Sequence, residues 1–400
     1  MKIMFVILFI GLNFSQSTAL SLYGVGEKYG VTDVSTIALG NSTFFSGNKF
    51  NISTNSTSSL WRSALTRFAI FSGMHYITNP QIPTQYEQNL TFFSLSFPVG
   101  NKKVIGLGIQ PAFRTNKIEI EETIQYSEDD INFAGRPFAY KNKYFVDGGI
   151  SKVFLQYSQK IISNSSLGFQ YSYLFGNQFL DDFLYIYDVE LDEIESTTNV
   201  TKSHQFAGSE ILIEGRYATP KQEWVIRTGF NGKTKVQTEI TQFPDYLSKN
   251  TSQAKLSEVA FGYQYMASDH LGILSEFHLN YPFNVPDAIA LFNTMPPKET
   301  SIHFGTYYQY VNQKIGFWNN LNVRSGAYLK ELNFIGEKLF DYGATLGLGI
   351  EYLGNTQSID LALRAGKKES RILKGDYENY ISFHIGITTG EKWFMKRRRK

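Results

Sequence analysis

The chain has 400 residues, and charged residues make up 18% of them and aromatic residues 16%. It has no cysteine, which excludes a disulfide-stapled scaffold and a thiolate zinc site, and its net charge of +2 gives no electrostatic reason to expect nucleic acid. No apolar run of about 18 residues follows the N-terminus, so a helical membrane protein is excluded, whereas a transmembrane β-barrel is still allowed.

Residues 1–19 have the pattern of a secretory signal. Lys2 supplies the positive charge, residues 3–12 form a short apolar core, and Ser17-Thr18-Ala19 is a small-x-small cleavage site. We predict that this segment is removed during Sec-type export. The alternative is an N-terminal strand that begins at Met1.

Residues 20–59 are rich in glycine, carry few charges and lack long alternation. Such a segment ahead of the first strand can fold back into a barrel, and we predict a hatch, with Gly24, Gly26 and Gly40 as candidate residues. The alternative is a disordered periplasmic tail.

Period-two alternation predicts strands through residues 60–394, which we expect to form the barrel. In one segment Leu167, Phe169 and Tyr171 share a face, and Gly168 and Gln170 share the other. Side chains alternate faces along a strand, so each strand has one apolar and one polar or small face. The predicted strands are 60–78, 89–98, 103–115, 143–160, 165–176, 203–218, 222–231, 255–267, 270–281, 300–311, 315–328, 342–352, 357–366 and 378–390.

The connections between these strands alternate between short and long. Outer-membrane barrels have short periplasmic turns and long external loops around an even number of strands. A soluble sandwich shows the same alternation of side chains but has no reason to sort its loops this way. The sequence therefore predicts an all-β fold, a transmembrane antiparallel β-barrel of about fourteen strands.

The polar faces of the strands should point into the barrel, because a charge on the lipid face near the midplane costs roughly 2–4 kcal/mol. We expect the charges to pair across the interior, and ion selectivity is the alternative. Small inward residues such as Gly262 and Gly347 leave space for water, a ligand or a plug. The candidate lumen-facing residues are Glu210, Glu214, Arg216, Arg227, Glu258, Arg324, Glu351, Asp360, Arg364 and His384.

Residues 179–195 break the strand rhythm and predict an amphipathic, acidic helix that could cover the barrel mouth as a lid. A solvated acidic face is the alternative. Residues 285–292 predict a second short helix with Pro286 in its first turn, and residues 131–140 add apolar character to the outer loops. The candidate lid residues recur at helical spacing and are Leu180, Phe183, Leu184, Tyr187, Leu191 and Ile194.

No motif in the sequence predicts an enzyme. The six histidines are scattered without metal-ligand spacing, and neither a Gly-x-Ser-x-Gly elbow nor a phosphate-binding glycine loop is present. A lumen histidine such as His384 is more often a satisfied hydrogen-bonding group than a catalyst. We expect no catalysis, no cofactor and no metal.

Several segments resemble the FadL-like family of outer-membrane transport proteins, especially its divergent Bacteroidetes-type branch. They are Leu22-Tyr23-Gly24-Val25-Gly26, Ala38-Leu39-Gly40, Arg324-Ser325-Gly326-Ala327-Tyr328, residues 342–349, residues 365–368, and the end of the chain from residue 385 with its basic tail at 395–400. The resemblance implies a fourteen-stranded barrel with an N-terminal hatch. It also implies that outer loops capture a hydrophobic ligand and pass it to an inner pocket. Asn41-Ser42-Thr43-Phe44-Phe45 departs from the small-residue run that usually follows in the family.

The resemblance predicts a passive outer-membrane transporter for hydrophobic compounds such as long-chain fatty acids. Expected partners are outer-membrane lipid, a hydrophobic small-molecule ligand and the barrel-insertion machinery of a Gram-negative bacterium. The branch also includes secretion components, so a scaffold in protein secretion or surface attachment is the alternative. An aqueous pore is a third possibility.

Overall fold

The computed structural model describes most of the chain. The described residues are 27–48, 51–78, 85–114, 118–121, 125–131, 137–188, 193–252, 254–281, 298–311, 320–334, 337–352, 357–370 and 377–391. The predicted signal at 1–19, the helix at 285–292 and the basic tail at 395–400 lie outside them. No helix within the described residues has the length and apolar character needed to cross a membrane.

A single antiparallel sheet closes on itself to form a barrel. Of the nineteen strands found within the described residues, fourteen form the closed wall, with β19 pairing to β2. The wall strands are β2 Thr66–Thr78, β3 Gln85–Gly100, β4 Lys103–Arg114, β7 Pro137–Ile162, β8 Ser165–Asp188, β9 Glu193–Ala218, β10 Gln222–Asn231, β13 Lys255–Met266, β14 Leu271–Asn280, β15 Lys298–Val311, β16 Asn320–Phe334, β17 Glu337–Tyr352, β18 Gln357–Ser370 and β19 Tyr377–Glu391. The predicted architecture of fourteen antiparallel strands is confirmed.

The remaining five strands belong to segments outside the wall circuit. β5 (Ile118–Glu121) and β6 (Gln125–Ile131) pair with β7, and β11 (Thr234–Ile240) pairs with β9 and with β12 (Phe243–Ser252). β1 (Glu27–Lys28) pairs with the end of β4. Two connections that the sequence predicted to be long loops therefore contain strands of their own.

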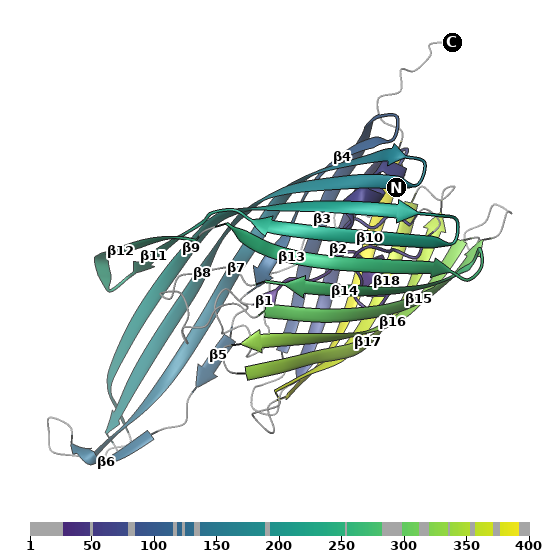
Figure 1. Cartoon of the computed structure of the whole chain (residues 1–400). Helices are drawn as coiled ribbons and strands as arrows, with labels where there is room; N and C mark the ends of the chain where they lie inside the picture. The colour runs from purple at the N-terminus through teal and green to yellow at the C-terminus, as the bar shows by residue number, and fades with distance from the viewer. Residues whose placement is uncertain are drawn as a thin grey trace, which may run out of the picture.

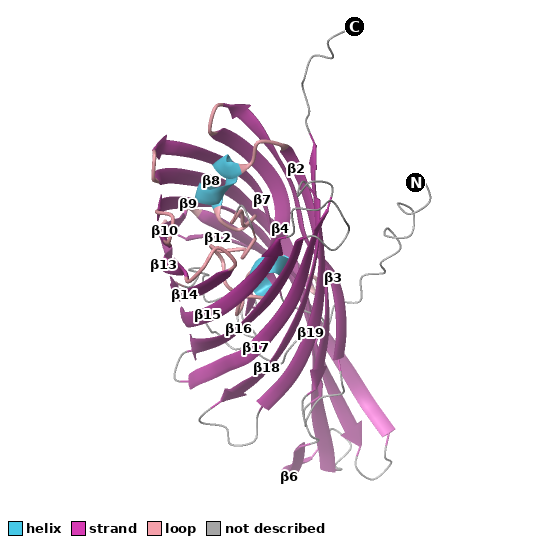
Figure 2. Ribbon diagram, turned by 90° about the vertical axis from the view of Figure 1, so that its right-hand side faces the viewer, coloured by secondary structure: helices cyan, strands magenta, loops and turns pink. Residues whose placement is uncertain are grey.

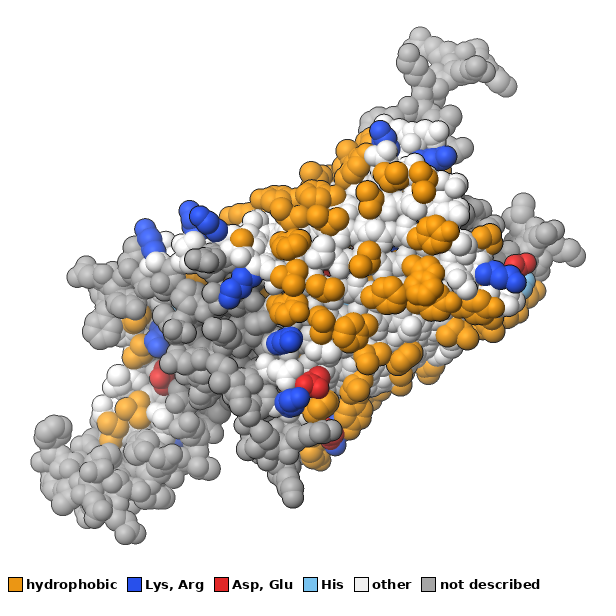
Figure 3. Space-filling view, viewed as in Figure 1, with side chains coloured by type: hydrophobic (Ala, Val, Ile, Leu, Met, Phe, Trp, Pro, Cys, Tyr) orange, Lys and Arg blue, Asp and Glu red, His pale blue; other side chains and the backbone are white. Residues whose placement is uncertain are grey.

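Alternation of side chains gives the wall an apolar outside and a polar inside. In β19 the side chains of Ile381, Phe383 and Ile385 are exposed, whereas those of Ser382 and His384 between them are buried. Apolar side chains cover much of the outer surface of the barrel (Figure 3). This is the arrangement of a barrel whose outer face contacts lipid.

The first wall strand begins later than predicted. Residues 60–62 belong to the 3-10 helix η3 (Thr57–Arg62), and β2 starts at Thr66. The serine-rich run ahead of Leu60 favours local turns, because serine hydroxyls bond to nearby backbone groups: Ser59 Oγ donates to the Ser56 carbonyl at 2.8 Å. The predicted strand therefore began six residues too early, at residue 60 instead of Thr66.

Residues 179–195 do not form the predicted helix. β8 continues to Asp188 and β9 starts at Glu193, so the lid candidates are strand residues; Leu191 lies outside the described residues. Leu180, Phe183, Leu184 and Tyr187 lie in β8, and Ile194 lies in β9.

The segment forms a strand instead of a helix because β8 has a neighbouring strand on each side along its whole length. β7 and β9 pair with it throughout, so its backbone groups are satisfied between strands. Rings at alternate positions form a row along one face. Phe183 and Tyr185 stack with centroids 6.2 Å apart, and Tyr185 and Tyr187 are tilted with centroids 6.5 Å apart. Apolar residues at helical spacing coincided with an equally good alternating pattern.

β7, β8 and β9 extend well beyond the rest of the wall (Figure 1). They have 26, 24 and 26 residues, whereas β10 and β14 have 10 each. A membrane-spanning strand needs about 9–11 residues. The additional residues therefore form a three-stranded extension on the side of the barrel opposite the short turns.

The N-terminal part of the chain lies inside the barrel. Figure 2 shows both helices within the ring of strands. They are α1 (Val34–Ile37), capped by the Asp33 side chain, which accepts from the Ser35 amide at 3.0 Å, and η3. α1 contacts β17, β18 and β19, and η3 contacts β7, β8 and β9. We call the described residues between 27 and 62 the luminal segment.

A charge on the outer face should prevent stable insertion into lipid. Leu346 is 60% exposed in the middle of β17, and Leu346→Arg should destabilise the barrel folded in lipid vesicles by about 2–4 kcal/mol. The folded fraction can be followed by the heat-dependent shift in gel mobility. Leu346→Met is the control and should fold as the parent does. Equal folding of both variants would contradict a lipid-facing wall.

Candidate functional site

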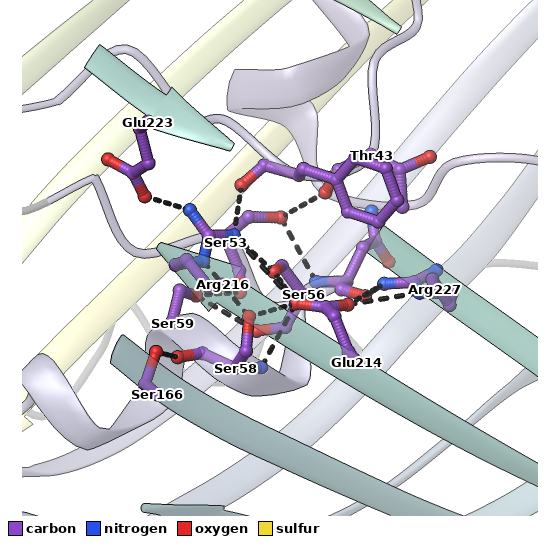
Figure 4. Close-up of polar contacts among 12 residues, drawn as sticks. Thr43, Ser53, Ser56, Ser58, Ser59, Ser166, Glu214, Arg216, Glu223 and Arg227 are labelled. Atoms are coloured by element: carbon purple, nitrogen blue, oxygen red, sulfur yellow. Dashed lines mark hydrogen bonds and ion pairs between the residues drawn. The ribbon is translucent and has the colours of Figure 1, made fainter. Parts of the chain in front are cut away.

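A buried carboxylate, Glu214 of β9, holds the luminal segment against the wall (Figure 4). One of its oxygens accepts hydrogen bonds from the hydroxyls of Ser56 and Ser58 and, at 3.0 Å, from the Ser58 amide. The other oxygen accepts two bonds from the Arg227 guanidinium, at 2.6 and 3.0 Å. Glu214 is fully buried, so an ionised side chain needs this full set of donors.

Two arginines extend the same network. Arg216 donates to Glu223, to the Ser58 hydroxyl at 2.9 Å and to the Phe44 carbonyl at 3.0 Å. Glu223 also pairs with Arg62 of η3 at 2.9 Å. Two wall strands, β9 and β10, thus bind separate points of the luminal segment through charged groups. We call Glu214, Arg216, Glu223 and Arg227 the wall cluster.

A second carboxylate binds the segment further along. Glu276 of β14 accepts from the amide of Thr43 at 2.7 Å and from that of Phe44 at 2.9 Å. His278, two residues later on the same inward face, lies 3.0 Å from Glu276 and stacks on the Phe44 ring, with centroids 5.4 Å apart. Backbone amides held by a carboxylate fix the chain direction as well as its position.

The third contact uses the backbone at Gly40. Its amide donates to Thr345 Oγ1 at 2.8 Å, and its carbonyl lies 2.8 Å from His303 Nδ1. Gly40 has φ of 72°, and a Cβ there would collide with the carbonyl oxygens of Phe304 and Ala327. Only glycine fits a left-handed conformation at such close approach to the wall.

Apolar packing fills the space between these polar contacts. Phe44 and Phe45 are fully buried in a cluster with Leu39, Val225, Ala260, Leu274 and Tyr307. The guanidinium of Arg227 lies 4.8 Å from the Phe44 ring centroid, and that of Arg216 lies 5.5 Å from the centroid of Phe45. The arginines therefore neutralise carboxylates and cover aromatic faces at the same time.

A polar cavity of about 90 Å³ lies between the luminal segment and the wall. Its lining includes Asn55, Gln170, Arg227 and His278. This is room for a few water molecules, and the lining offers them hydrogen-bond partners.

Each lysine that lines the cavity has a glutamate partner. Lys28 lies 3.4 Å from Glu258, Lys152 lies 3.0 Å from Glu210, and Lys330 lies 3.4 Å from Glu299. The positive charges at the cavity are therefore already balanced by carboxylates.

An apolar cluster lies at the end of the barrel away from the short turns, on the inward faces of four wall strands and on β11. We call Ala112, Ile150, Leu174, Phe206 and Val236 the outer apolar patch; all five are buried. Leu174 also borders a cavity of about 40 Å³, together with Tyr29, Phe113 and Leu332. Inward positions nearer the middle of the same strands are polar, as at Gln156, Gln170 and Glu214.

The ten predicted lumen-facing residues all lie on wall strands and point inward, Arg364 being half-buried and the others buried. The structure brings Glu214, Arg216, Arg227 and Glu258 together around the luminal segment. Glu210 pairs with Lys152 and Arg324 with Asp360, Glu351 accepts from Asn322, and Arg364 and His384 meet at Ser382. Of the hatch candidates, Gly40 makes the close approach above, and Gly24 and Gly26 lie outside the described residues.

The sequence interpretation missed four residues of these contacts: Glu223, Glu276, and Ser56 and Ser58, which bond to Glu214. The sequence did carry a signal for the two glutamates. Glu223 alternates in phase with Arg227 in β10, and Glu276 alternates in phase with the polar His278 and Asn280 in β14. For Ser56 and Ser58 the sequence carried no signal, since their partners are more than 150 positions away.

No metal centre is evident in the part of the chain that the structure describes, where no group of three or more His, Asp or Glu side chains could hold an ion. The histidines at the luminal segment instead bond to Glu276 and to the Gly40 carbonyl. The chemistry of this region is hydrogen bonding and charge pairing between the wall and an internal segment.

Comparison with known proteins agrees with this architecture. A protein-family model described as BamG matches residues 1–259. No curated protein matches the chain. Solved structures with a similar fold include the CymD monoaromatic hydrocarbon channel, with a TM-score of 0.56 at 13% identity over 92% of this chain and 99% of that one.

Two further structures are similar over 92% of this chain and 100% of their own. They are a Pseudomonas aeruginosa FadL homologue, with a TM-score of 0.55 at 11% identity, and the Pseudomonas putida toluene transporter TodX, with a TM-score of 0.52 at 12% identity. At these identities the likeness concerns the fold. The predicted resemblance to FadL-like barrels is confirmed at that level, and the Bacteroidetes-type branch stays a prediction.

Removal of the Glu214 charge should loosen the luminal segment. Glu214→Gln leaves Arg216 and Arg227 short of a partner in a buried site, which costs about 3–5 kcal/mol. A single thiol introduced by Ser59→Cys, buried in the parent, should then react with a polar maleimide about a hundredfold faster, since each 1.4 kcal/mol is a factor of ten. The chain has no cysteine of its own, so this thiol is the only one labelled.

The matched control is Glu239→Gln, an exposed carboxylate on β11. Its labelling rate should equal that of the parent. If Glu214→Gln also labels at the parent rate, the wall cluster does not hold the segment in place.

Proposed function

Because the chain belongs to the BamG family and folds as a FadL-like barrel, we propose that it lies in the outer membrane of a Gram-negative bacterium and passes hydrophobic compounds inward without an energy source. The molecule crosses the bilayer as a barrel, with outer-membrane lipid as its surroundings. Long-chain fatty acids are the finer ligand class that we propose.

The observation that carries this proposal is the outer apolar patch. Charged and polar side chains occupy most of the inward positions, yet Ile150, Leu174 and Phe206 converge at the outer end. These side chains are buried against one another, so a hydrophobic ligand that inserts among them leaves water itself, which gains about 25 cal/mol per Å² of its apolar surface. The patch borders the small cavity, which Lys28 and Tyr29 of the luminal segment also line.

The luminal segment would act as a hatch in this proposal. It lies directly between the patch and the short-turn end of the barrel, and its contacts are of a kind that can be exchanged. Hydrogen bonds to Glu214 and Glu276 can be replaced by bonds to water when the segment moves, because each net contribution is about 0.5–3 kcal/mol.

The ligand's apolar body rather than its charge would supply most of the affinity. Lys28, Lys152 and Lys330 already have glutamate partners, so a carboxylate head group would compete for them instead of meeting a free cation. A fatty acid would therefore bind through its chain at Leu174 and Phe206. The compound would pass through unchanged, and we propose no catalytic step.

The second candidate function is a binding component for other proteins in the assembly or secretion of outer-membrane proteins. Two observations favour it: the BamG family match, whose name is associated with barrel assembly, and the extension of β7, β8 and β9. On that extension the rings of Phe145 and Phe183 meet edge to face with centroids 5.6 Å apart, next to the tilted rings of Tyr185 and Tyr187. Aromatic rows of this kind are common at protein interfaces.

Purification of the protein with its bound molecules distinguishes the two candidate functions. A stoichiometric protein partner that is lost in Tyr185→Ala, with uptake of hydrophobic compounds unchanged, would favour the binding component. Hydrophobic small molecules retained through mild detergent, with no protein partner, would favour transport.

A polar group in the outer apolar patch should slow transport. Leu174→Asn removes a buried apolar side chain worth about 1.5–3 kcal/mol and should reduce the uptake of a labelled long-chain fatty acid about tenfold or more. Uptake is measured in proteoliposomes with the protein level matched. Leu174→Met keeps the apolar character and should transport as the parent does. Equal uptake by both variants would remove the patch from the route.

Deletion of residues 20–59 tests the hatch. The lumen should open, with higher ion conductance in planar bilayers and altered leakage of the labelled fatty acid, because the wall alone leaves the interior unfilled. Unchanged conductance together with unchanged flux would count against a hatch.

A further inference from the structure

The outer surface of the wall carries a groove near the short-turn end that is separate from the lumen. Its volume is about 550 Å³, and its lining, almost wholly apolar, includes Leu167, Gly215, Tyr217, Trp224 and Ile226. It extends to Ile161 and Ile162 at the turn between β7 and β8. The groove is on the opposite face of β9 from the wall cluster.

A single glycine creates the floor of this groove. Leu167 of β8, Gly215 of β9 and Ile226 of β10 are directly opposite one another across three strands. The other outward residues of this part of β9 are Ile211, Ile213 and Tyr217, all large and exposed. The missing side chain at Gly215 therefore leaves a notch between Leu167, 51% exposed, and Ile226, 61% exposed.

Only hydrocarbon suits this position. The groove is continuous with the apolar belt that the barrel presents to lipid, and water would find almost no hydrogen-bond partner on its lining. Its end nearest the turns is formed by Tyr217 and Trp224, rings that favour the level of the lipid head groups.

The surroundings also fit an anionic head group. Ile161 and Ile162 are 52% and 61% exposed at the turn, so they reach the edge of the bilayer. Lys221, which is exposed, lies in the neighbouring turn three residues before Trp224. A cation at that level attracts a phosphate, while the groove accepts a chain.

We propose that this groove binds one acyl chain of an anionic phospholipid from the leaflet on the short-turn side, with the phosphate at Lys221. The lipid packs against Gly215 and between Leu167 and Ile226. The site is independent of what passes through the lumen, and it needs only that the barrel spans a membrane.

Gly215→Leu is the informative variant, because it fills the groove without disturbing the wall. A Cβ at Gly215 would have its nearest neighbours at 3.7 Å, in Ile226, and 3.8 Å, in Leu167, which is ordinary contact distance. Ile213→Leu is the matched control: it lies on the same strand and face and does not line the groove.

The experiment is native mass spectrometry of the full-length protein, purified in mild detergent and supplied with phosphatidylglycerol and phosphatidylcholine of matched chains. The parent and Ile213→Leu should each retain one phosphatidylglycerol, and Gly215→Leu should retain at least tenfold less. Lys221→Gln should keep a bound lipid but lose the preference for phosphatidylglycerol.

Two results would overturn the proposal. One is equal lipid retention by the parent and Gly215→Leu. The other is a lipid-free dimer of the parent that Gly215→Leu converts to monomer, which would assign the groove to a second copy of the chain. Normal heat-dependent gel mobility of Gly215→Leu shows that its barrel is folded.

Discussion

The structure depends on one constraint: a chain surrounded by hydrocarbon must satisfy its own backbone hydrogen bonds. A closed antiparallel sheet does this without leaving an edge, and β19 pairs with β2 to complete it. Closure then decides the side chains, because every strand has one face toward lipid and one toward the interior. The same division places Glu214 and Arg216 on the interior face and Leu346 on the lipid face. The interior of so wide a barrel is polar, and it has to be filled.

The luminal segment fills the interior and bonds to charged side chains that are already paired with one another in the wall. Glu214 bonds to Arg227 from a neighbouring strand and still has an oxygen for Ser56 and Ser58. Small residues on the segment allow the backbone to come close, as at Gly40 beside Thr345. Removal of one charged member leaves another uncompensated, so the wall and the segment stabilise each other. This mutual dependence explains how a segment with so few charges of its own is held firmly.

The sequence predicted the parts of this arrangement that repeat at short range. Alternation located all fourteen wall strands. The prediction failed at residues 179–188, where the apolar residues fit both the helical period and the alternation of a strand. Pairing with β7 and β9 favours the strand there. Contacts such as Thr43 with Glu276 join positions 233 apart, and no local pattern encodes them. Parity alone could have identified Glu223 and Glu276.

The length of β7, β8 and β9 has a consequence for biogenesis. Their extension carries Lys141, Lys143, Asp181 and Asp182, which lie beyond the apolar belt on the side of the long connections. A chain that enters the bilayer from the short-turn side has to move these charges through hydrocarbon before the wall can close, at a cost of several kcal/mol for each unshielded charge. Spontaneous insertion of this hairpin would therefore be slow. The feature that extends the molecule beyond the membrane therefore also raises the barrier to its own insertion.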